Sequence, residues 1–264
     1  MSAKAAQHPA PILSARGIVN RFGKQEVHDR ISLDVLPGEV LGIAGGSGSG
    51  KSVLLKTLIG LHRPNAGEVL LNGKAVETLD PAEKASLIGV LFQQGALFSS
   101  LSVAQNVMLP LREHTDLPPE EQQRLVSLKL ALAGLSAESG AKFPSELSGG
   151  MVKRAAFARA IALDPRILFL DEPTSDLDPL TASGIDALIR QLNQSLGLTI
   201  IIVTHDLSTL FTVCGRVAVL VDRKITIGTV DELMHSKQPW IHEFLHGPRA
   251  QGAMTAGKRS HGNG

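Results

Sequence analysis

The chain has 264 residues, of which 43% are hydrophobic and 19% are charged, so it can bury a large core without disulfides or metals. Its 26 basic and 25 acidic residues leave a formal net charge of +1, which gives no electrostatic reason to expect nucleic-acid binding. Cys214 is the single cysteine, which excludes an intramolecular disulfide framework. No apolar run approaches the roughly 18 residues of a membrane-spanning helix, and the first residues lack the apolar segment of a signal peptide. We therefore expect a folded, cytoplasmic chain.

Short apolar runs alternate with stretches of helical spacing along the chain. This alternation is typical of a parallel sheet that is covered by helices on both faces. The runs that predict strands are 40–44, 69–71, 88–92, 167–170, 199–203 and 217–221. Asn72-Gly73 follows the second run and predicts a hairpin turn. Residues 53–61 have helical spacing and predict a helix, which we expect the segment Arg63–Gly67 to end.

The middle and the end of the chain differ from this pattern. Residues 99–144 are rich in Leu and Ala, have helical spacing around 125–135 and contain no convincing strand, which predicts a helical insertion. The last residues are polar and rich in Gly, which predicts disorder. We expect one domain over residues 1–245. This domain consists of a core of about 12–92 and 155–245 and a helical subdomain of about 96–154, and a disordered tail over 246–264 follows it.

A glycine-rich segment follows the first predicted strand. It fits the phosphate-loop pattern G-x-x-x-x-G-K-[ST], in which backbone N–H groups and the next helix's positive end surround a phosphate. Lys51 can reach the β- and γ-phosphates, and the Ser52 hydroxyl can bind Mg²⁺. A flexible Gly/Ser loop is the alternative, and the dinucleotide pattern fails because Lys51 replaces its last glycine. The residues predicted to surround a nucleoside triphosphate are Gly45, Gly46, Ser47, Gly48, Ser49, Gly50, Lys51, Ser52 and Val53.

The run Arg166–Glu172 predicts a buried strand that ends in two carboxylates. We expect Asp171 to lie beside Ser52 and its Mg²⁺, with a water molecule between them. Glu172 points elsewhere and is placed to polarise the attacking water. Taken alone, this pattern fits a capping role equally well. The phosphate loop upstream favours the catalytic interpretation.

Leu147 to Met151, with Ser148, Gly149 and Gly150 between them, precede an Ala-rich helix expected over 153–163. Ser148 can cap this helix, and the glycines leave its N–H groups open to an anion. A simple capped helix is the alternative. A chain with one complete phosphate loop needs no second, so we expect this helix to serve a nucleotide held by another copy.

In this order the motifs resemble the nucleotide-binding subunit of an ABC transporter, over about residues 12–245. The resemblance implies an α/β fold: a P-loop NTPase (RecA-like) core with an antiparallel β subdomain and a helical insertion subdomain. It also implies a homodimer of ATPase subunits that binds ATP and Mg²⁺ and hydrolyses ATP. Met151 and Asp176 depart from the family, which usually has Gln and Ala there. Neither departure removes a group that contacts phosphate.

The resemblance assigns roles to further residues. Phe22 matches the aromatic that stacks on adenine, and Gln93 the glutamine that contacts Mg²⁺ and senses the membrane partner. Asp178 lies in the loop 175–178 that crosses the dimer, and His205 matches the switch histidine near the γ-phosphate. The expected catalytic residues are Glu172, His205 and Lys51, and the expected metal ligands are Ser52, Gln93 and Asp171.

Three stretches narrow the class: Phe92–Val103, Pro110–Thr115 and Pro144–Met151. They resemble the ATPase of the Mla/Mce-type phospholipid transport system of diderm bacteria. This implies an integral-membrane permease, an MCE-domain substrate-binding protein and a small STAS-domain protein as partners, and no nucleic acid. It also implies a position at the cytoplasmic face of the inner membrane, attached through the permease.

Two alternatives stay open from the sequence. One is the ATPase of an ABC transporter for another solute, such as amino acids or lipoproteins. The other, less favoured, is a soluble ABC ATPase that acts on ribosomes or DNA, since such proteins usually carry two cassettes or a long coiled coil. A GTPase is excluded because no N-K-x-D motif occurs.

Overall fold

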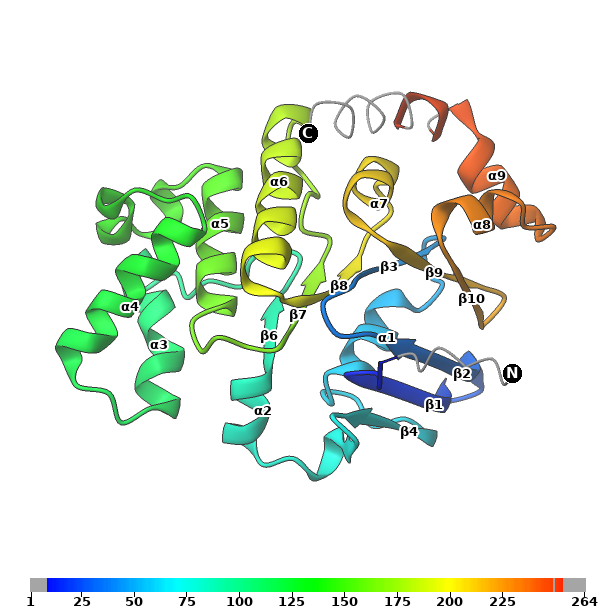
Figure 1. Ribbon diagram of the computed structural model, residues 1–264, viewed down its shortest axis with the longest axis horizontal. Helices are drawn as coiled ribbons and strands as arrows, with labels where there is room; N and C mark the ends of the chain where they lie inside the picture. The colour runs from blue at the N-terminus through cyan, green and yellow to red at the C-terminus, as the bar shows by residue number, and fades with distance from the viewer. Residues whose placement is uncertain (1–8, 249, 254–264) are drawn as a thin grey trace, which may run out of the picture.

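The computed structural model describes residues 9–248 and 250–253 (Figure 1). Two sheets and a group of helices make up the fold. The elements in chain order are β1 (Leu13–Phe22), β2 (Gln25–Val35), β3 (Val40–Gly45), α1 (Lys51–Leu58), β4 (Ala66–Leu71), β5 (Lys74–Ala75), η1 (Val76–Thr78), α2 (Pro81–Leu87), β6 (Ile88–Leu91), α3 (Val103–His114), α4 (Pro119–Leu132), η2 (Ala137–Ala141), η3 (Pro144–Glu146), α5 (Gly149–Ala160), β7 (Ile167–Asp171), α6 (Pro179–Leu196), β8 (Thr199–Val203), α7 (Leu207–Val213), β9 (Arg216–Val221), β10 (Lys224–Gly228), α8 (Val230–Met234) and α9 (Pro239–His246).

The larger sheet has the strand order β10-β9-β3-β8-β7-β6. Its strands from β9 to β6 are parallel, and β10 pairs antiparallel at the edge. The predicted runs at 40–44, 88–92, 167–170, 199–203 and 217–221 all form strands of this sheet. Every residue of β8 is buried, because helices or strands cover both faces of the sheet. The predicted α/β core is confirmed.

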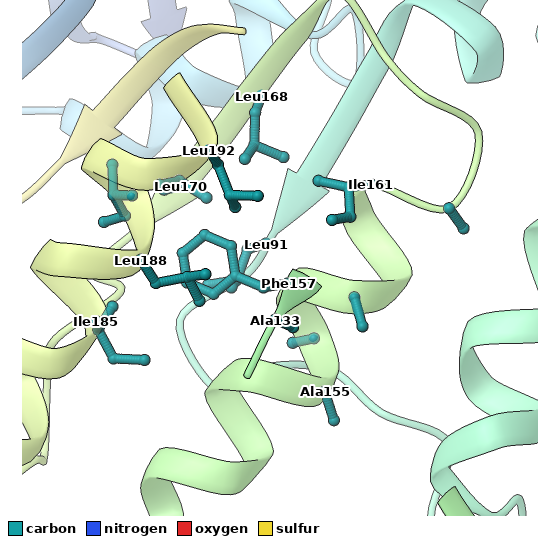
Figure 2. Close-up of a cluster of buried hydrophobic side chains, with 14 of the residues drawn as sticks. Leu91, Ala133, Ala155, Phe157, Ile161, Leu168, Leu170, Ile185, Leu188 and Leu192 are labelled. Atoms are coloured by element: carbon teal, nitrogen blue, oxygen red, sulfur yellow. The ribbon is translucent and has the colours of Figure 1, made fainter. Parts of the chain in front are cut away.

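Neighbouring residues of the central strands pack on opposite faces, as strand geometry requires. On one face Leu168 and Leu170 of β7 pack with Phe157 of α5 and with Leu188 and Leu192 of α6 (Figure 2). The other face, which includes Phe169 of β7, packs against α1 and the smaller sheet. These two apolar layers hold the carboxyl ends of β3, β7 and β8 along one edge of the sheet. The predicted site residues lie at the ends of these strands or directly after them.

The smaller sheet is antiparallel, with the order β2-β1-β4-β5. The predicted hairpin turn is present: Asn72 and Gly73 both have positive φ, 49° and 78°, as a type I′ turn requires. The sequence pattern missed β1 and β2. Their pairing contains register shifts near Ile18 and Asn20, which break the alternation of apolar and polar residues. The antiparallel sheet that the resemblance implied is therefore confirmed, although the periodicity did not show it.

The helical insertion is confirmed over α3, α4 and the turns η2 and η3, and Figure 1 shows these elements at one end of the molecule. Helix α5 contacts α3 and α4 as well as β6 and α6. The proposed boundary at residues 154 and 155 therefore falls inside one continuous helix, and the division into subdomains stays a proposal. Within the described part of the chain, no helix combines the length and apolarity needed to cross a bilayer.

Two expected segment ends differ from the structure. Helix α1 ends at Leu58 rather than at Arg63–Gly67, because Gly60 adopts a left-handed φ of 72° that closes the helix. Leu61 is consequently outside the helix and 65% exposed. In the expected tail, Pro248 and residues 250–253 are helical, and Ala250 and Ala253 are buried. Residues 254–264 lie outside the described residues.

Candidate functional site

The glycine-rich loop joins β3 to α1 at the carboxyl edge of the larger sheet. Two of its glycines are required by the space around them. A Cβ on Gly45 would lie 2.6 Å from the carbonyl oxygen of Leu220, and a Cβ on Gly50 would lie 2.5 Å from Cγ1 of Val27. Gly50 also has a φ of 97°, which other residues rarely adopt. These contacts fix both ends of the loop and leave Ser47 and Gly48 exposed at its tip.

Lys51 is folded back over the loop. Its Nζ donates to the carbonyl oxygens of Gly45, at 2.9 Å, and Gly46, at 3.0 Å. Burial lowers the pKa of Lys51, and the charges of Glu172 and Asp171 partly offset this effect. The first turn of α1 contains no acidic residue, so the helix does not neutralise its own positive end. The loop, the ammonium and the helix end together form an anion-binding site.

Asp171 ends β7 and Glu172 follows it. The two are brought close to Lys51, since both carboxylates act on its charge. Burial raises the pKa of Asp171, and repulsion from Glu172 raises it further, while Lys56, Lys153 and Lys51 oppose the shift. A half-buried pair of carboxylates beside several lysines is typical of a catalytic centre.

The structure places Glu172 and His205 in contact, although they lie far apart in the sequence. His205 Nδ1 is 2.9 Å from Oε1 of Glu172, and the Thr204 hydroxyl donates to Oε2 at 3.3 Å. The Glu172 side chain is 12% exposed and that of His205 is 70% exposed. Glu172 is thus held from one side by the two residues that follow β8, and the His205 side chain is exposed.

Phe22 lies at the end of β1, half exposed, and stacks on His62 with ring centroids 5.2 Å apart. Gln93 lies after β6 with its side chain exposed. Its backbone carbonyl accepts from Lys153. Sequence reasoning found Phe22 and Gln93 only through their places in the series of motifs, and the structure shows no contact that defines their roles.

Ser148 caps α5, accepting from the N–H of Met151 at 3.3 Å. Ser148 and Gly149 are exposed, and Gly150 is buried against α6, where a Cβ would lie 2.5 Å from Cγ2 of Thr181. Asp178 caps α6, accepting from the N–H groups of Leu180, at 3.1 Å, and Thr181, at 3.0 Å. The helix predicted over 153–163 begins earlier, at Gly149, because Ser148 caps it directly, and it ends at Ala160.

Two cavities adjoin these residues. One, of about 510 Å³, lies beside Glu172 and His205 and is lined on its other side by Pro248, Gly252 and Ala253. The other, of about 360 Å³, separates β6 from the end of α3. Its lining includes Phe92, Phe98, Pro110, Glu113 and Arg159. The second cavity lies where the core meets the helical insertion.

A polar network behind the phosphate loop escaped the sequence analysis. Thr57 donates to the carbonyl of Val53 at 2.9 Å, so its oxygen can only accept from the Asn20 amide, 2.9 Å away. The other hydrogen of that amide then goes to Nδ1 of His28, also at 2.9 Å. His28 is therefore neutral, with its proton on Nε2. No sequence signal marks these residues, which lie on three separate elements.

His28 packs directly against the phosphate loop. A Cβ on Gly50 would lie 2.7 Å from Nε2 of His28. This nitrogen is buried, and its approach to Gly50 does not have the geometry of a hydrogen bond. Burial lowers the pKa of His28 to about 4, although the nearby Gly50 backbone favours the charged form. The imidazole thus stays uncharged behind the anion-binding loop at neutral pH.

Comparisons with known proteins agree with this geometry. The protein-family model described as ABC transporter matches residues 28–175. The probable ribonucleotide transport ATP-binding protein mkl of Mycobacterium leprae is 40% identical over 241 residues, covering 90% of this chain and 69% of that protein. The intermembrane phospholipid transport system ATP-binding protein MlaF of Haemophilus influenzae is 38% identical over 240 residues, covering 89% of this chain and 90% of that protein.

Solved structures show the same fold. The ATP-binding cassette MJ0796, solved as a dimer in a post-hydrolysis state with ADP and Pi, has a TM-score of 0.74 and 31% identity, covering 82% of this chain and 98% of that one. The cbiO1 protein from Clostridium perfringens, part of the ABC transporter complex cbiONQ, has a TM-score of 0.78 and 30% identity, covering 93% of this chain and 99% of that one. The fold and the site define an ABC-type ATPase. The chain belongs to the ABC transporter family, as an ATP-binding and ATP-hydrolysing subunit.

The neutral His28 predicts a pH dependence of stability. Between pH 6.5 and about 4 the unfolded chain binds a proton at this residue that the folded chain does not, so the free energy of unfolding falls as the pH falls through this window. His28→Asn keeps an acceptor for Asn20 but cannot titrate, so urea unfolding of this variant should show a shallower loss. His235→Asn, at an exposed position, is the control. Equal slopes for wild type and His28→Asn would contradict the assignment.

Proposed function

We propose that the chain powers the movement of phospholipid between the inner and outer membranes, as the ATPase of an Mla/Mce-type system. The observation that carries this proposal is the length of the match. The MlaF proteins of Haemophilus influenzae and Escherichia coli match over 89–91% of this chain and 90–91% of their own. The mycobacterial mkl proteins match over only 67–69% of their length.

Catalysis in this proposal divides between binding and water activation. The phosphate loop and Lys51 hold the β- and γ-phosphates of ATP. Glu172 orients the attacking water and takes its proton while the bond between the γ-phosphorus and the β–γ bridging oxygen breaks, releasing ADP and phosphate. The contact between His205 and Glu172, at 2.9 Å, supports a shared role beside the γ-phosphate. Phe22 stacks on the adenine.

The residues present fit Mg²⁺. Ser52, Gln93 and Asp171 offer hydroxyl, amide and carboxylate oxygens, which are the ligands this ion prefers. The pKa of Asp171 is raised by burial and by repulsion from Glu172, and a divalent cation offsets both effects. We propose that these three residues hold Mg²⁺, with Asp171 acting through a water. The bound ion neutralises charge on the phosphate oxygens.

We propose that two copies pair head to tail. Ser148 and Gly149 are exposed at the positive end of α5, where they can contact the γ-phosphate held by the partner copy. Leu180, next to the Asp178 cap, is 83% exposed and supports an interface at this edge. A dimer of the related cassette MJ0796 has been solved.

The cavity of about 360 Å³ is the proposed seat of the permease. Its lining is apolar at Phe92 and Phe98 and charged at Glu113 and Arg159, which suits an amphipathic helix. Through this permease the chain is held at the cytoplasmic face of the inner membrane. The MCE-domain protein and the small STAS-domain protein complete the proposed assembly.

Two substitutions should separate ATP binding from hydrolysis. Lys51→Ala should weaken ATP binding, because it removes the charge beside the phosphates. Glu172→Gln should bind ATP normally but turn over about 10²- to 10⁴-fold more slowly, because the general base is lost. Nucleotide affinity and phosphate release measure the two effects. Glu68→Gln on β4, an exposed position, is the matched control. Near wild-type turnover of Glu172→Gln would contradict its role.

The dimer proposal is tested in the Glu172→Gln background. With ATP this variant should sediment as a dimer, because the closed state is not hydrolysed. Adding Ser148→Arg should return it to a monomer, since bulk and charge then occupy the place of the partner's γ-phosphate. Ser127→Arg, exposed on α4, adds the same group elsewhere and should leave the dimer intact. A dimer that survives Ser148→Arg would exclude α5 from the interface.

The cargo is tested in the complete complex, purified in mild detergent and reconstituted in liposomes. Labelled phospholipid should move between the MCE-domain protein of the complex and the vesicles only when Glu172 is intact. Since the mkl relatives are named for ribonucleotide transport, a ribonucleotide uptake assay is the second arm. Lipid movement that Glu172→Gln leaves unchanged, or uptake of ribonucleotide instead, would overturn the phospholipid proposal and leave the ATPase activity standing.

A further inference from the structure

Lys153 lies in the second turn of α5 and is only 6% exposed. Its ammonium contacts three oxygens from two segments that are far apart in the sequence. It donates to the backbone carbonyl of Gln93, to that of Glu172 at 3.0 Å, and to the hydroxyl of Ser175 at 3.4 Å. One buried cation thus joins α5 to the segments that follow β6 and β7, and both segments belong to the proposed site.

The hydrogen bonds to the Glu172 carbonyl help to fix an unusual backbone conformation. Glu172 has a left-handed φ of 48°, which residues other than glycine adopt only when their surroundings enforce it. Its N–H donates to the carbonyl of Val203 at 2.8 Å. Its own carbonyl accepts from the Ser175 N–H at 3.2 Å, from the Ser175 hydroxyl at 2.9 Å, and from Lys153. The direction of the Glu172 carboxylate depends on this backbone conformation. Loss of the Lys153 ammonium removes one of the hydrogen bonds that hold the Glu172 carbonyl.

The other end of the bridge is the Gln93 loop, residues 92–102 between β6 and α3. Helix α5 holds this loop twice. Lys153 binds the carbonyl of Gln93, and the guanidinium of Arg159 binds those of Gly95, at 2.8 Å, and Ala96, at 2.7 Å. Arg159 also lines the cavity of about 360 Å³. A shift of Arg159 at this cavity would therefore move the Gln93 loop, and the loop would move the carbonyl that Lys153 binds.

The acceptors of the ammonium are uncharged, which leaves the cation without a direct ion pair among the described residues. Asp176, Glu172 and Asp171 act on it only from a distance, and burial lowers the pKa of Lys153 despite them. A buried cation of this kind is costly unless its hydrogen bonds are complete. The three oxygens and the ammonium should therefore move as a unit.

We propose that Lys153 is a positioning residue that couples the Gln93 loop to the catalytic carboxylate, by bridging the backbone carbonyls of Gln93 and Glu172. The inference rests on the proposed role of Glu172 in water activation. Lys153 does not contact the nucleotide in this scheme. It acts on the rate of hydrolysis, and not on ATP affinity.

The test replaces the ammonium in the full-length chain. Lys153→Met keeps an unbranched side chain that is one atom shorter, and it removes all three hydrogen bonds. Turnover should fall about 10- to 100-fold while the Kd for ATP stays within about threefold, because Lys51 and the phosphate loop are untouched. Lys153→Arg, which keeps the charge and donors, should recover part of the lost turnover. A merely structural role would affect affinity and turnover together and would give no such recovery.

Lys129 provides the matched control. It is another buried lysine, 2% exposed, and its ammonium pairs with Asp164 away from the site. Lys129→Met should lower the melting temperature without reducing turnover of the folded protein. If Lys153→Met does not fold, Lys153→Gln replaces it, since its amide can reach one carbonyl but not both, and turnover should still fall. A folded Lys153 variant with wild-type turnover would overturn the proposal.

A second measurement follows the coupling itself. A fluorophore on Gln94→Cys, an exposed position in the Gln93 loop, is introduced with Cys214→Ala so that it labels one site. ATP should change its emission when Lys153 is present and have little effect in Lys153→Met. An equal response in both would show that the bridge transmits nothing. If the chain with Lys153 hydrolyses no ATP, the role of Glu172 fails first, so the two failures are distinguishable.

Discussion

The site depends on one strand, β3, which pairs in parallel with β8 on one side and β9 on the other. This pairing fixes where the strand ends, and the phosphate loop begins at that point. Gly45 and Gly50 then admit no side chain, because Leu220 and Val27 occupy the space. Since parallel strands place their carboxyl ends at one edge, the two carboxylates at the end of β7 and the histidine after β8 meet the loop there. The two apolar layers matter to function because they hold this edge in register.

Charge distribution explains how the site can receive a triphosphate. The ammonium of Lys51 rests on two carbonyl oxygens of its own loop, and several lysines face Asp171 and Glu172. A triphosphate exchanges the weak carbonyl partners of Lys51 for charged ones, which are stronger acceptors. The neutral imidazole of His28 adds no charge of its own behind the loop.

The sequence was informative wherever chemistry and backbone conformation are local. The phosphate loop and the Asp171-Glu172 pair follow from a few adjacent residues, and continuous apolar runs marked the parallel strands. It was silent where a polar group finds a distant partner. Lys153 meets a carbonyl 60 residues earlier in the chain, and Asn20 meets a hydroxyl 37 residues later. Neither residue type nor spacing reports such contacts. The strands β1 and β2 were missed because their register shifts disrupt the period-two pattern.

Helix α5 carries several sites on one rigid element. Ser148 caps it, Lys153 reaches the backbone of Glu172, and Arg159 reaches the cavity beside β6. The spacing between them is fixed by helical geometry, in which each residue adds about 1.5 Å and turns by about 100°. A single inserted or deleted residue between Ser148 and Arg159 would turn one contact away from its target whichever end stayed in place. Evolution of this helix is consequently restricted to substitution, and its length is as constrained as any side chain in the site.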